Sequence, residues 1–152
     1  MVKYVDTRVV FEEVPDCVSL GISISNCPFS CPGCHSPYLR EDCGEVLDEG
    51  RLDALVRENS GVNCVLFMGD GKDADGLCGL ADHVRSAFPG MKTAVYSGMS
   101  GPMERYLGSF DYIKTGRYDE KYGALDSETT NQRFYENSGG ELKDITYKFW
   151  KR

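Results

Sequence analysis

Three of the seven cysteines in this 152-residue chain fall within eight positions, at Cys27, Cys31 and Cys34. Their C-x3-C-x2-C spacing places three thiolates on one short loop, and thiolates are soft ligands that select zinc, copper(I) or iron–sulfur clusters. A structural zinc site uses four closed ligands, and a closed 4Fe–4S cluster uses four cysteines. Three thiolates on a four-iron cluster leave one iron open to a substrate. The pattern therefore predicts a catalytic iron–sulfur site.

Residues near the triplet leave a zinc site open as an alternative. His35 would complete a set of four ligands, although neighbours such as Cys34 and His35 rarely point at one metal together. Cys43 is a further candidate for a fourth ligand. The other cysteines are expected to be inert core or surface residues: Cys17, Cys64 and Cys78.

The elements that must position the triplet are predicted from hydrophobic periodicity. Residues 18–25 alternate apolar with small polar side chains, which predicts a strand that ends in the cysteine loop. Short apolar runs predict further strands, and helical spacing predicts helices between them. The predicted strands are 3–12, 18–25, 64–68, 93–96, 111–114 and 144–150, and the predicted helices run from Asp48 to about 61 and from 77 to 88, with a short one over 102–107.

Alternation of strands and helices predicts a parallel sheet with right-handed crossovers. A complete eight-fold barrel needs about 200 residues or more, so the expected fold is a single α/β domain over 1–152. We expect a partial (β/α) barrel or open sheet with mostly parallel strands and an N-terminal strand or hairpin added. In such folds the site gathers at the carboxyl ends of the strands, where the cysteine loop, Gly69-Asp70-Gly71 and Tyr96-Ser97-Gly98 all fall.

Charge and hydropathy exclude some classes of partner. The formal net charge is −7 and the sequence pI is about 4.8, which argues against a nucleic-acid binder or a polybasic membrane-surface protein. The chain contains no apolar run of about 18 residues and its first residues show no secretory signal, so we expect a cytoplasmic protein that binds neither nucleic acid nor membrane.

Several segments together resemble a known family. They are Ser25-Asn26-Cys27, Cys31-Pro32-Gly33-Cys34-His35, residues 111–118, residues 123–127 and Thr130-Asn131-Gln132-Arg133. The cysteine spacing is similar to that of the radical S-adenosylmethionine superfamily. The combination resembles the activating proteins of anaerobic ribonucleoside-triphosphate reductase, over about residues 16–135.

The resemblance implies the cofactors and the reaction. Cys27, Cys31 and Cys34 would hold three irons of a 4Fe–4S cluster, and the amino and carboxylate groups of S-adenosylmethionine would chelate the fourth. Reductive cleavage would give methionine and a 5′-deoxyadenosyl radical, which would take hydrogen from a backbone glycine of the large reductase subunit. The implied enzyme is thus a radical oxidoreductase supplied by a low-potential electron donor such as a flavodoxin. No catalytic residue beyond the cluster ligands is implied.

The resemblance also suggests which residues bind the cofactor. Gly33, Cys34 and His35 would shape its pocket, and Gly69 with Asp70 stands where the superfamily has Gly-Gly-Glu. Asp70 is expected to pair with the methionine ammonium, although Gly-Asp-Gly would equally make an ordinary turn. Two other functions remain open: a radical enzyme that acts on a small molecule or another glycyl-radical enzyme, and a zinc-binding interaction module.

Overall fold

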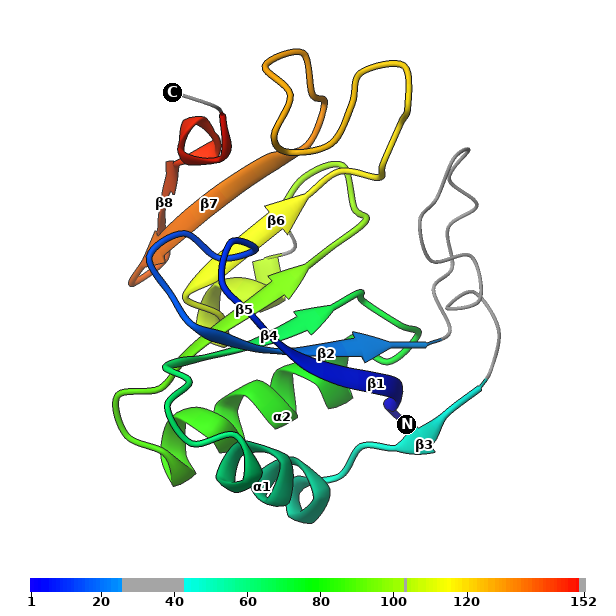
Figure 1. Cartoon of the computed structure of the whole chain (residues 1–152), viewed down its shortest axis with the longest axis vertical. Helices are drawn as coiled ribbons and strands as arrows, with labels where there is room; N and C mark the ends of the chain where they lie inside the picture. Colours follow the sequence, from blue (N-terminus) through cyan, green and yellow to red (C-terminus); the bar gives the residue numbers. More distant parts are fainter. Residues whose placement is uncertain (26–42, 103, 151–152) are drawn as a thin grey trace.

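One mixed β-sheet forms the centre of the molecule (Figure 1). The computed structural model describes residues 1–25, 43–102 and 104–150. Across the sheet the strands run in the order β3-β1-β2-β4-β5-β6-β7-β8. The elements are β1 (Lys3–Val10), β2 (Ser19–Ile24), β3 (Glu45–Val46), α1 (Glu49–Glu58), β4 (Cys64–Met68), α2 (Ala74–Ala87), β5 (Lys92–Tyr96), η2 (Glu104–Gly108), β6 (Tyr112–Thr115), β7 (Arg133–Ser138), β8 (Glu141–Asp144) and η3 (Thr146–Phe149).

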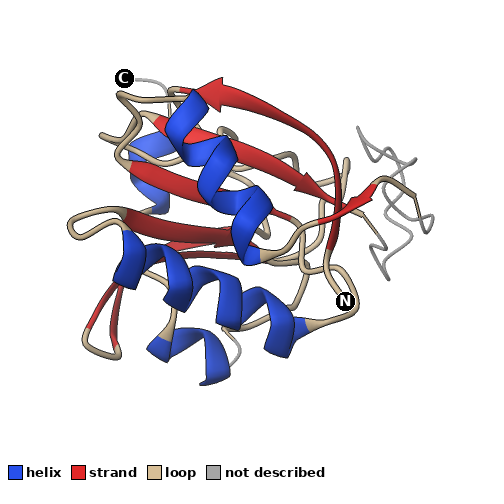
Figure 2. Ribbon diagram, turned by 90° about the horizontal axis from the view of Figure 1, so that it is seen from below, coloured by secondary structure: helices blue, strands red, loops and turns tan. Residues whose placement is uncertain are grey.

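The four central strands, β2, β4, β5 and β6, are parallel, and their carboxyl ends lie at one edge of the sheet (Figure 1). Helices α1 and α2 cover one face (Figure 2). Leu20, Ile22 and Phe67 from the strands are fully buried against that layer. Burying apolar side chains between a sheet and its helices is the main source of stability in such a layered fold.

A side-chain cap begins each helix, and the Asp48 cap of α1 is the one that the sequence predicts. The Asp48 carboxylate accepts a hydrogen bond from the Arg51 amide at 2.8 Å, and the Asp73 carboxylate accepts one from the Gly76 amide at 2.9 Å. Each cap satisfies an amide in the first turn that has no partner within its helix. Helix α2 ends at Ala87, two residues before Pro89.

The opposite face of the sheet is covered by irregular segments and by η3. Val14 and Leu125 lie on two of these segments and are buried against strand residues such as Leu66. Phe134 stacks on Tyr112 with ring centroids 5.9 Å apart, and Phe149 of η3 meets Phe134 edge-on. The described residues therefore build a second apolar layer on this face without an α-helix.

The predicted partial (β/α) barrel with a mostly parallel sheet is wrong. Most strand pairings are antiparallel: β1 with β2, β1 with β3, β6 with β7, and β7 with β8. The described residues form two α-helices only. After β6 the chain forms an antiparallel hairpin of β7 and β8. Its turn, Gly139-Gly140, has φ angles of +62° and +96°. Two glycines with positive φ form the kind of tight turn that joins antiparallel strands.

The predicted strand 144–150 is also wrong. Strand β8 ends at Asp144 and the 3₁₀ helix η3 follows. The Asp144 carboxylate accepts hydrogen bonds from the Thr146 amide at 3.0 Å and from its hydroxyl at 2.6 Å. These local hydrogen bonds favour a turn of the chain over the extended conformation that a strand would need.

Within the described ranges, no helix combines the length and the apolar character that crossing a membrane requires.

Candidate functional site

The carboxyl end of β2 leads directly into the predicted metal loop. Ser25, the last described residue there, donates its hydroxyl to the Cys43 carbonyl at 2.7 Å, and its amide donates to the Lys3 carbonyl at 3.1 Å. Ser25 and Cys43, which flank the segment 26–42, are therefore held side by side. The predicted ligands and pocket residues Cys27, Cys31, Gly33, Cys34 and His35 lie outside the described residues.

The predicted Gly69-Asp70-Gly71 turn lies against the same end of β2. Gly69 has φ +123°, and a Cβ there would come within 3.3 Å of the Ile24 carbonyl oxygen. Gly71 has φ +62°, and its Cβ would lie 3.0 Å from Ile24 Cγ2 and 3.2 Å from the Ser25 carbonyl oxygen. Positive φ and close approach both favour glycine. This turn therefore borders the point where the cysteine-bearing segment leaves β2.

Asp70 uses both carboxylate oxygens to hold neighbouring elements. One oxygen accepts a hydrogen bond from the Gly98 amide at 2.6 Å, and the other accepts one from the Tyr106 hydroxyl at 2.6 Å. Burial of Tyr106, followed by the nearby Asp70 charge, raises the pKa of its hydroxyl, which therefore stays a donor. A carboxylate offers about four acceptor positions, so Asp70 keeps acceptor capacity for a further donor.

The loop after β5 is fixed by backbone and side-chain hydrogen bonds. The Ser97 amide donates to the Lys114 carbonyl at 2.8 Å, and the Ser97 hydroxyl accepts from the Met99 amide at 3.1 Å. The Met99 carbonyl accepts from the Gly116 amide at 2.6 Å. Together with the Asp70–Gly98 bond, these contacts join the carboxyl ends of β4, β5 and β6 into one continuous edge.

A buried cation lies at this edge. Lys114 is 8% exposed, and its ammonium donates to the carbonyls of Ser97 at 3.2 Å and Gly116 at 2.7 Å. The ammonium also lies 5.5 Å from the centroid of the Tyr96 ring. Gln132, which precedes β7, donates its side-chain amide to the same Gly116 carbonyl at 3.3 Å. Carbonyl dipoles and an aromatic face compensate a charge removed from water.

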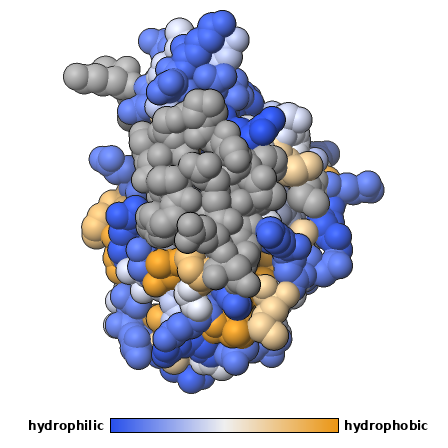
Figure 3. Space-filling view, turned by 90° about the vertical axis from the view of Figure 1, so that its right-hand side faces the viewer, coloured by the Kyte–Doolittle hydropathy of each residue, from blue (hydrophilic) through white to orange (hydrophobic). Residues whose placement is uncertain are grey.

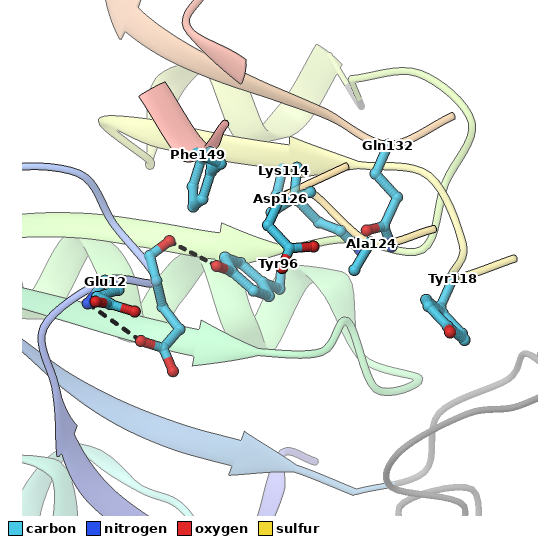
Figure 4. A pocket seen from close by; sticks show the side chains of 10 residues that line it. Glu12, Tyr96, Lys114, Tyr118, Ala124, Asp126, Gln132 and Phe149 are labelled. Atoms are coloured by element: carbon cyan, nitrogen blue, oxygen red, sulfur yellow. Dashed lines mark hydrogen bonds between the residues drawn. The ribbon is translucent and has the colours of Figure 1, made fainter. Parts of the chain in front are cut away.

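A cavity of about 500 Å³ opens over the sheet face opposite α1 and α2 (Figure 4). Its lining includes Tyr96, Lys114, Tyr118, Asp126, Gln132 and Phe149. The Tyr96 hydroxyl donates to the Glu13 carbonyl at 2.6 Å, and burial raises the pKa of that hydroxyl. The volume lies within the range of about 300–1,000 Å³ that small-molecule sites occupy.

The surface on the side of the carboxyl ends is mixed in character. Hydrophilic areas predominate among the described residues, with smaller apolar patches in the lower half of the view (Figure 3). In the described part of the chain, no group of three or more His, Cys, Asp or Glu side chains could hold a metal ion. The metal ligands proposed from the sequence therefore remain those of the segment 26–42.

Sequence reasoning brought Asp70 and the loop after β5 to one edge but missed two of the residues that organise it. Tyr106 carried no signal beyond its residue type, and Gln132 appeared only within the segment 130–133 that resembles the family, because their hydrogen-bond partners lie 36 and 16 positions away in the sequence. In the segment 130–133 that resembles the family, two polar side chains have structural partners: Asn131 donates to the Arg117 carbonyl at 3.1 Å, and Arg133 pairs with Asp144 at 2.8 Å.

Comparison of the chain with family models, with curated proteins and with solved structures finds no match.

Proposed function

We propose that this chain is an activating enzyme that reductively cleaves S-adenosylmethionine and generates a glycyl radical on an anaerobic ribonucleoside-triphosphate reductase. One observation carries the proposal: a C-x3-C-x2-C triplet follows the strand whose end borders the Gly69-Asp70-Gly71 turn. Three thiolates and an open fourth position suit a cluster that must bind its substrate. The donor set therefore fits a 4Fe–4S cluster held by Cys27, Cys31 and Cys34.

When bound, such a cluster supplies the electron that cleaves the sulfonium bond of S-adenosylmethionine, delivered from a low-potential donor such as a flavodoxin. The chain's own residues have separate tasks in this proposal. The Ser25–Cys43 hydrogen bond joins the two residues that flank the ligand-bearing segment, which restricts how far apart these two residues can move. Gly33, Cys34 and His35 contribute to the cofactor pocket within that segment.

In this proposal Asp70 binds the methionine ammonium. Its two internal hydrogen bonds use only part of the acceptor capacity of the carboxylate, so it can accept further bonds from the ammonium. Those two bonds fix the orientation of the carboxylate, and the glycines on either side of Asp70 approach Ile24 and Ser25, the last described residues before the cysteine-bearing segment. Gly69 and Gly71 lack side chains that would fill this space. A fixed carboxylate loses less entropy when it binds an ammonium than a mobile one would.

The first test is metal content and cofactor cleavage after reconstitution with iron and sulfide in the absence of oxygen. We expect iron, acid-labile sulfide, and release of 5′-deoxyadenosine and methionine. Cys31→Ala is expected to lose both cluster and cleavage because one of three thiolates is gone, whereas Cys78→Ala is expected to keep them. Stoichiometric zinc with no iron would support the zinc-binding module, and wild-type cleavage by Cys31→Ala would contradict the ligand assignment.

The second test addresses the partner. The reconstituted chain is mixed with the anaerobic reductase, S-adenosylmethionine and a reductant, and electron paramagnetic resonance is recorded without oxygen. We expect a glycyl radical signal on the reductase. Cofactor cleavage without any signal from an authentic reductase would overturn the activating role and favour a small molecule or another glycyl-radical enzyme as the substrate.

A further inference from the structure

The cavity over the sheet face opposite α1 and α2 has an almost fully buried amide in its lining. Gln132 is 5% exposed, and its side chain points toward Lys114 (Figure 4). Its side-chain nitrogen donates to the Gly116 carbonyl at 3.3 Å, whereas in the part of the chain that the structure describes nothing donates to its side-chain oxygen. Buried acceptors are normally paired, so this oxygen indicates a ligand that carries a hydrogen-bond donor.

Aromatic rings form the walls of the same cavity. Tyr96 comes from β5, Tyr118 from the chain after β6, and Phe149 from η3. Tyr118 and Phe149 are half-buried, so part of each side chain is accessible. The face of an aromatic ring attracts a cation, and a guanidinium group also stacks on it because the group is planar. Walls of this kind suit a flat, positively charged group.

Carboxylates outnumber cations around the cavity. Glu12 and Asp126 are exposed and Glu13 is half-buried. The opposing charge is Lys114, whose ammonium donates to two backbone carbonyls at 3.2 and 2.7 Å. Among the described residues that line the cavity, three therefore carry a negative charge and one carries a positive charge. A cleft with an excess of one sign of charge attracts ligands of the opposite sign, which here means a cation.

We propose that this cavity binds an alkylguanidinium group, the chemistry of an arginine side chain or of a small guanidine compound. The plane of the group stacks on the aromatic walls, one N–H donates to the Gln132 side-chain oxygen, and the Asp126 carboxylate pairs with the charge. A guanidinium has five N–H donors in one plane and can make these contacts together. An alkylammonium lacks the planar face and would use the walls less well.

The inference does not rest on the proposed radical chemistry, although the two sites are neighbours. The Lys114 ammonium bonds to the Ser97 carbonyl, and the adjacent Gly98 amide bonds to Asp70, the residue proposed to bind the methionine ammonium. S-adenosylmethionine is itself a cation. The experiment must therefore separate a guanidinium site from an extension of the cofactor pocket.

The experiment titrates the full chain with butylguanidinium and, separately, with butylurea, which has nearly the same shape but no charge. Two-dimensional NMR follows the backbone amides and the side-chain amide of Gln132. We expect butylguanidinium to bind with a Kd on the order of 1 mM, as suits so small a ligand, and butylurea to bind about tenfold more weakly or less. The signals expected to shift are the Gln132 side-chain amide and the backbone amides of Ala124 and Leu125, which line the cavity.

Matched variants test the charge. Asp126→Asn should weaken butylguanidinium binding by about three- to fivefold, because an exposed ion pair is lost. Asp82→Asn makes the same charge change at an exposed position on α2, which covers the other face of the sheet, and should change the affinity by less than about twofold. Both side chains are exposed, so neither substitution should disturb folding.

A third probe distinguishes the two sources of the group. An acetylated and amidated tripeptide with arginine between two glycines should bind more tightly than butylguanidinium if the site receives a polypeptide side chain, and more weakly if it receives a small compound. The proposal is overturned if no probe binds, if butylurea binds as tightly as butylguanidinium, or if Asp126→Asn and Asp82→Asn bind alike. It is also overturned if S-adenosylmethionine displaces butylguanidinium and shifts the same signals, which would assign the cavity to the cofactor.

Discussion

Replacing Tyr106 by Phe removes one oxygen atom from the site and leaves the ring in place. The hydroxyl donates to the Asp70 carboxylate at 2.6 Å, and Tyr106 is fully buried. Its ring meets Phe110 edge-on with centroids 5.2 Å apart, a contact that Phe retains. The substitution therefore tests a single hydrogen bond between η2 and the turn after β4.

The expected magnitude follows from the type of bond. A hydrogen bond to a charged acceptor contributes about 1.5–3 kcal/mol to folding. Asp70 is half-buried, so water can replace part of the lost donor, and we expect a loss near the lower limit, about 1.5–2 kcal/mol. For a chain of this length each kcal/mol lowers Tm by about 2–4 °C, which predicts a decrease of about 3–8 °C.

The assay is urea unfolding together with a thermal melt, followed by circular dichroism. Tyr147→Phe is the matched control, because its side chain is 50% exposed and its hydroxyl should contribute less than about 0.5 kcal/mol. Asp70→Asn and the double variant complete a cycle, in which we expect the two effects to be non-additive by about 0.5 kcal/mol or more. A Tyr106→Phe variant as stable as the wild type, or full additivity with Asp70→Asn, would refute the reasoning.

Three further predictions use other residues. Gly71→Ala should lower the free energy of unfolding by about 1–2 kcal/mol, because φ at Gly71 is +62° and the new Cβ would crowd Ile24. Gly79 lies inside α2 with open space around it, so Gly79→Ala should raise the free energy of unfolding by about 0.5–1 kcal/mol. Urea unfolding measures both changes. The alkylation rate of Cys17 should rise as the pH is raised through about 7, because the thiolate is the reacting form and hydrogen bonding to Cys64 lowers the pKa of Cys17 to about 7. Mass spectrometry at a series of pH values measures the rate. A midpoint near 8.5, about the pKa of an ordinary thiol, would contradict the lowered pKa of Cys17. Cys31→Ala should abolish S-adenosylmethionine cleavage, measured as released 5′-deoxyadenosine, and retained cleavage would exclude a ligand role for this residue.

The elements that local patterns define were predicted from the sequence. Alternation over 18–25 and the apolar run 64–68 correspond to β2 and β4. The Asp48 cap was predicted for α1 because capping depends on residues within one turn of each other. These features need no information about distant contacts, which is why periodicity and capping are sufficient to find them.

The direction of the flanking strands was not predicted, because it depends on partners far along the chain. Strand β7 buries only Phe134, so its periodicity is weak, and its pairing with β6 joins residues about 20 positions apart. The Gly139-Gly140 turn was the signal that could have indicated an antiparallel hairpin. On the other flank, β1 buries only Tyr4 and Val10 and its register shifts between Tyr4 and Thr7, so its own residues do not show that it runs antiparallel to β2.

The antiparallel flanks of the sheet change what surrounds the predicted site more than where the site lies. The rule that sites gather at carboxyl ends depends only on the direction of the central strands, and β2, β4, β5 and β6 are parallel. The antiparallel pairing of β7 with β6 places Gln132, the residue before β7, beside Gly116, whose carbonyl also accepts a hydrogen bond from Lys114. A purely parallel fold would not have placed the chain around Gln132 at the edge beside Asp70. The cavity over the sheet face opposite α1 and α2 also depends on the antiparallel return of the chain after β6, because Asp126, Gln132 and Phe149 line it.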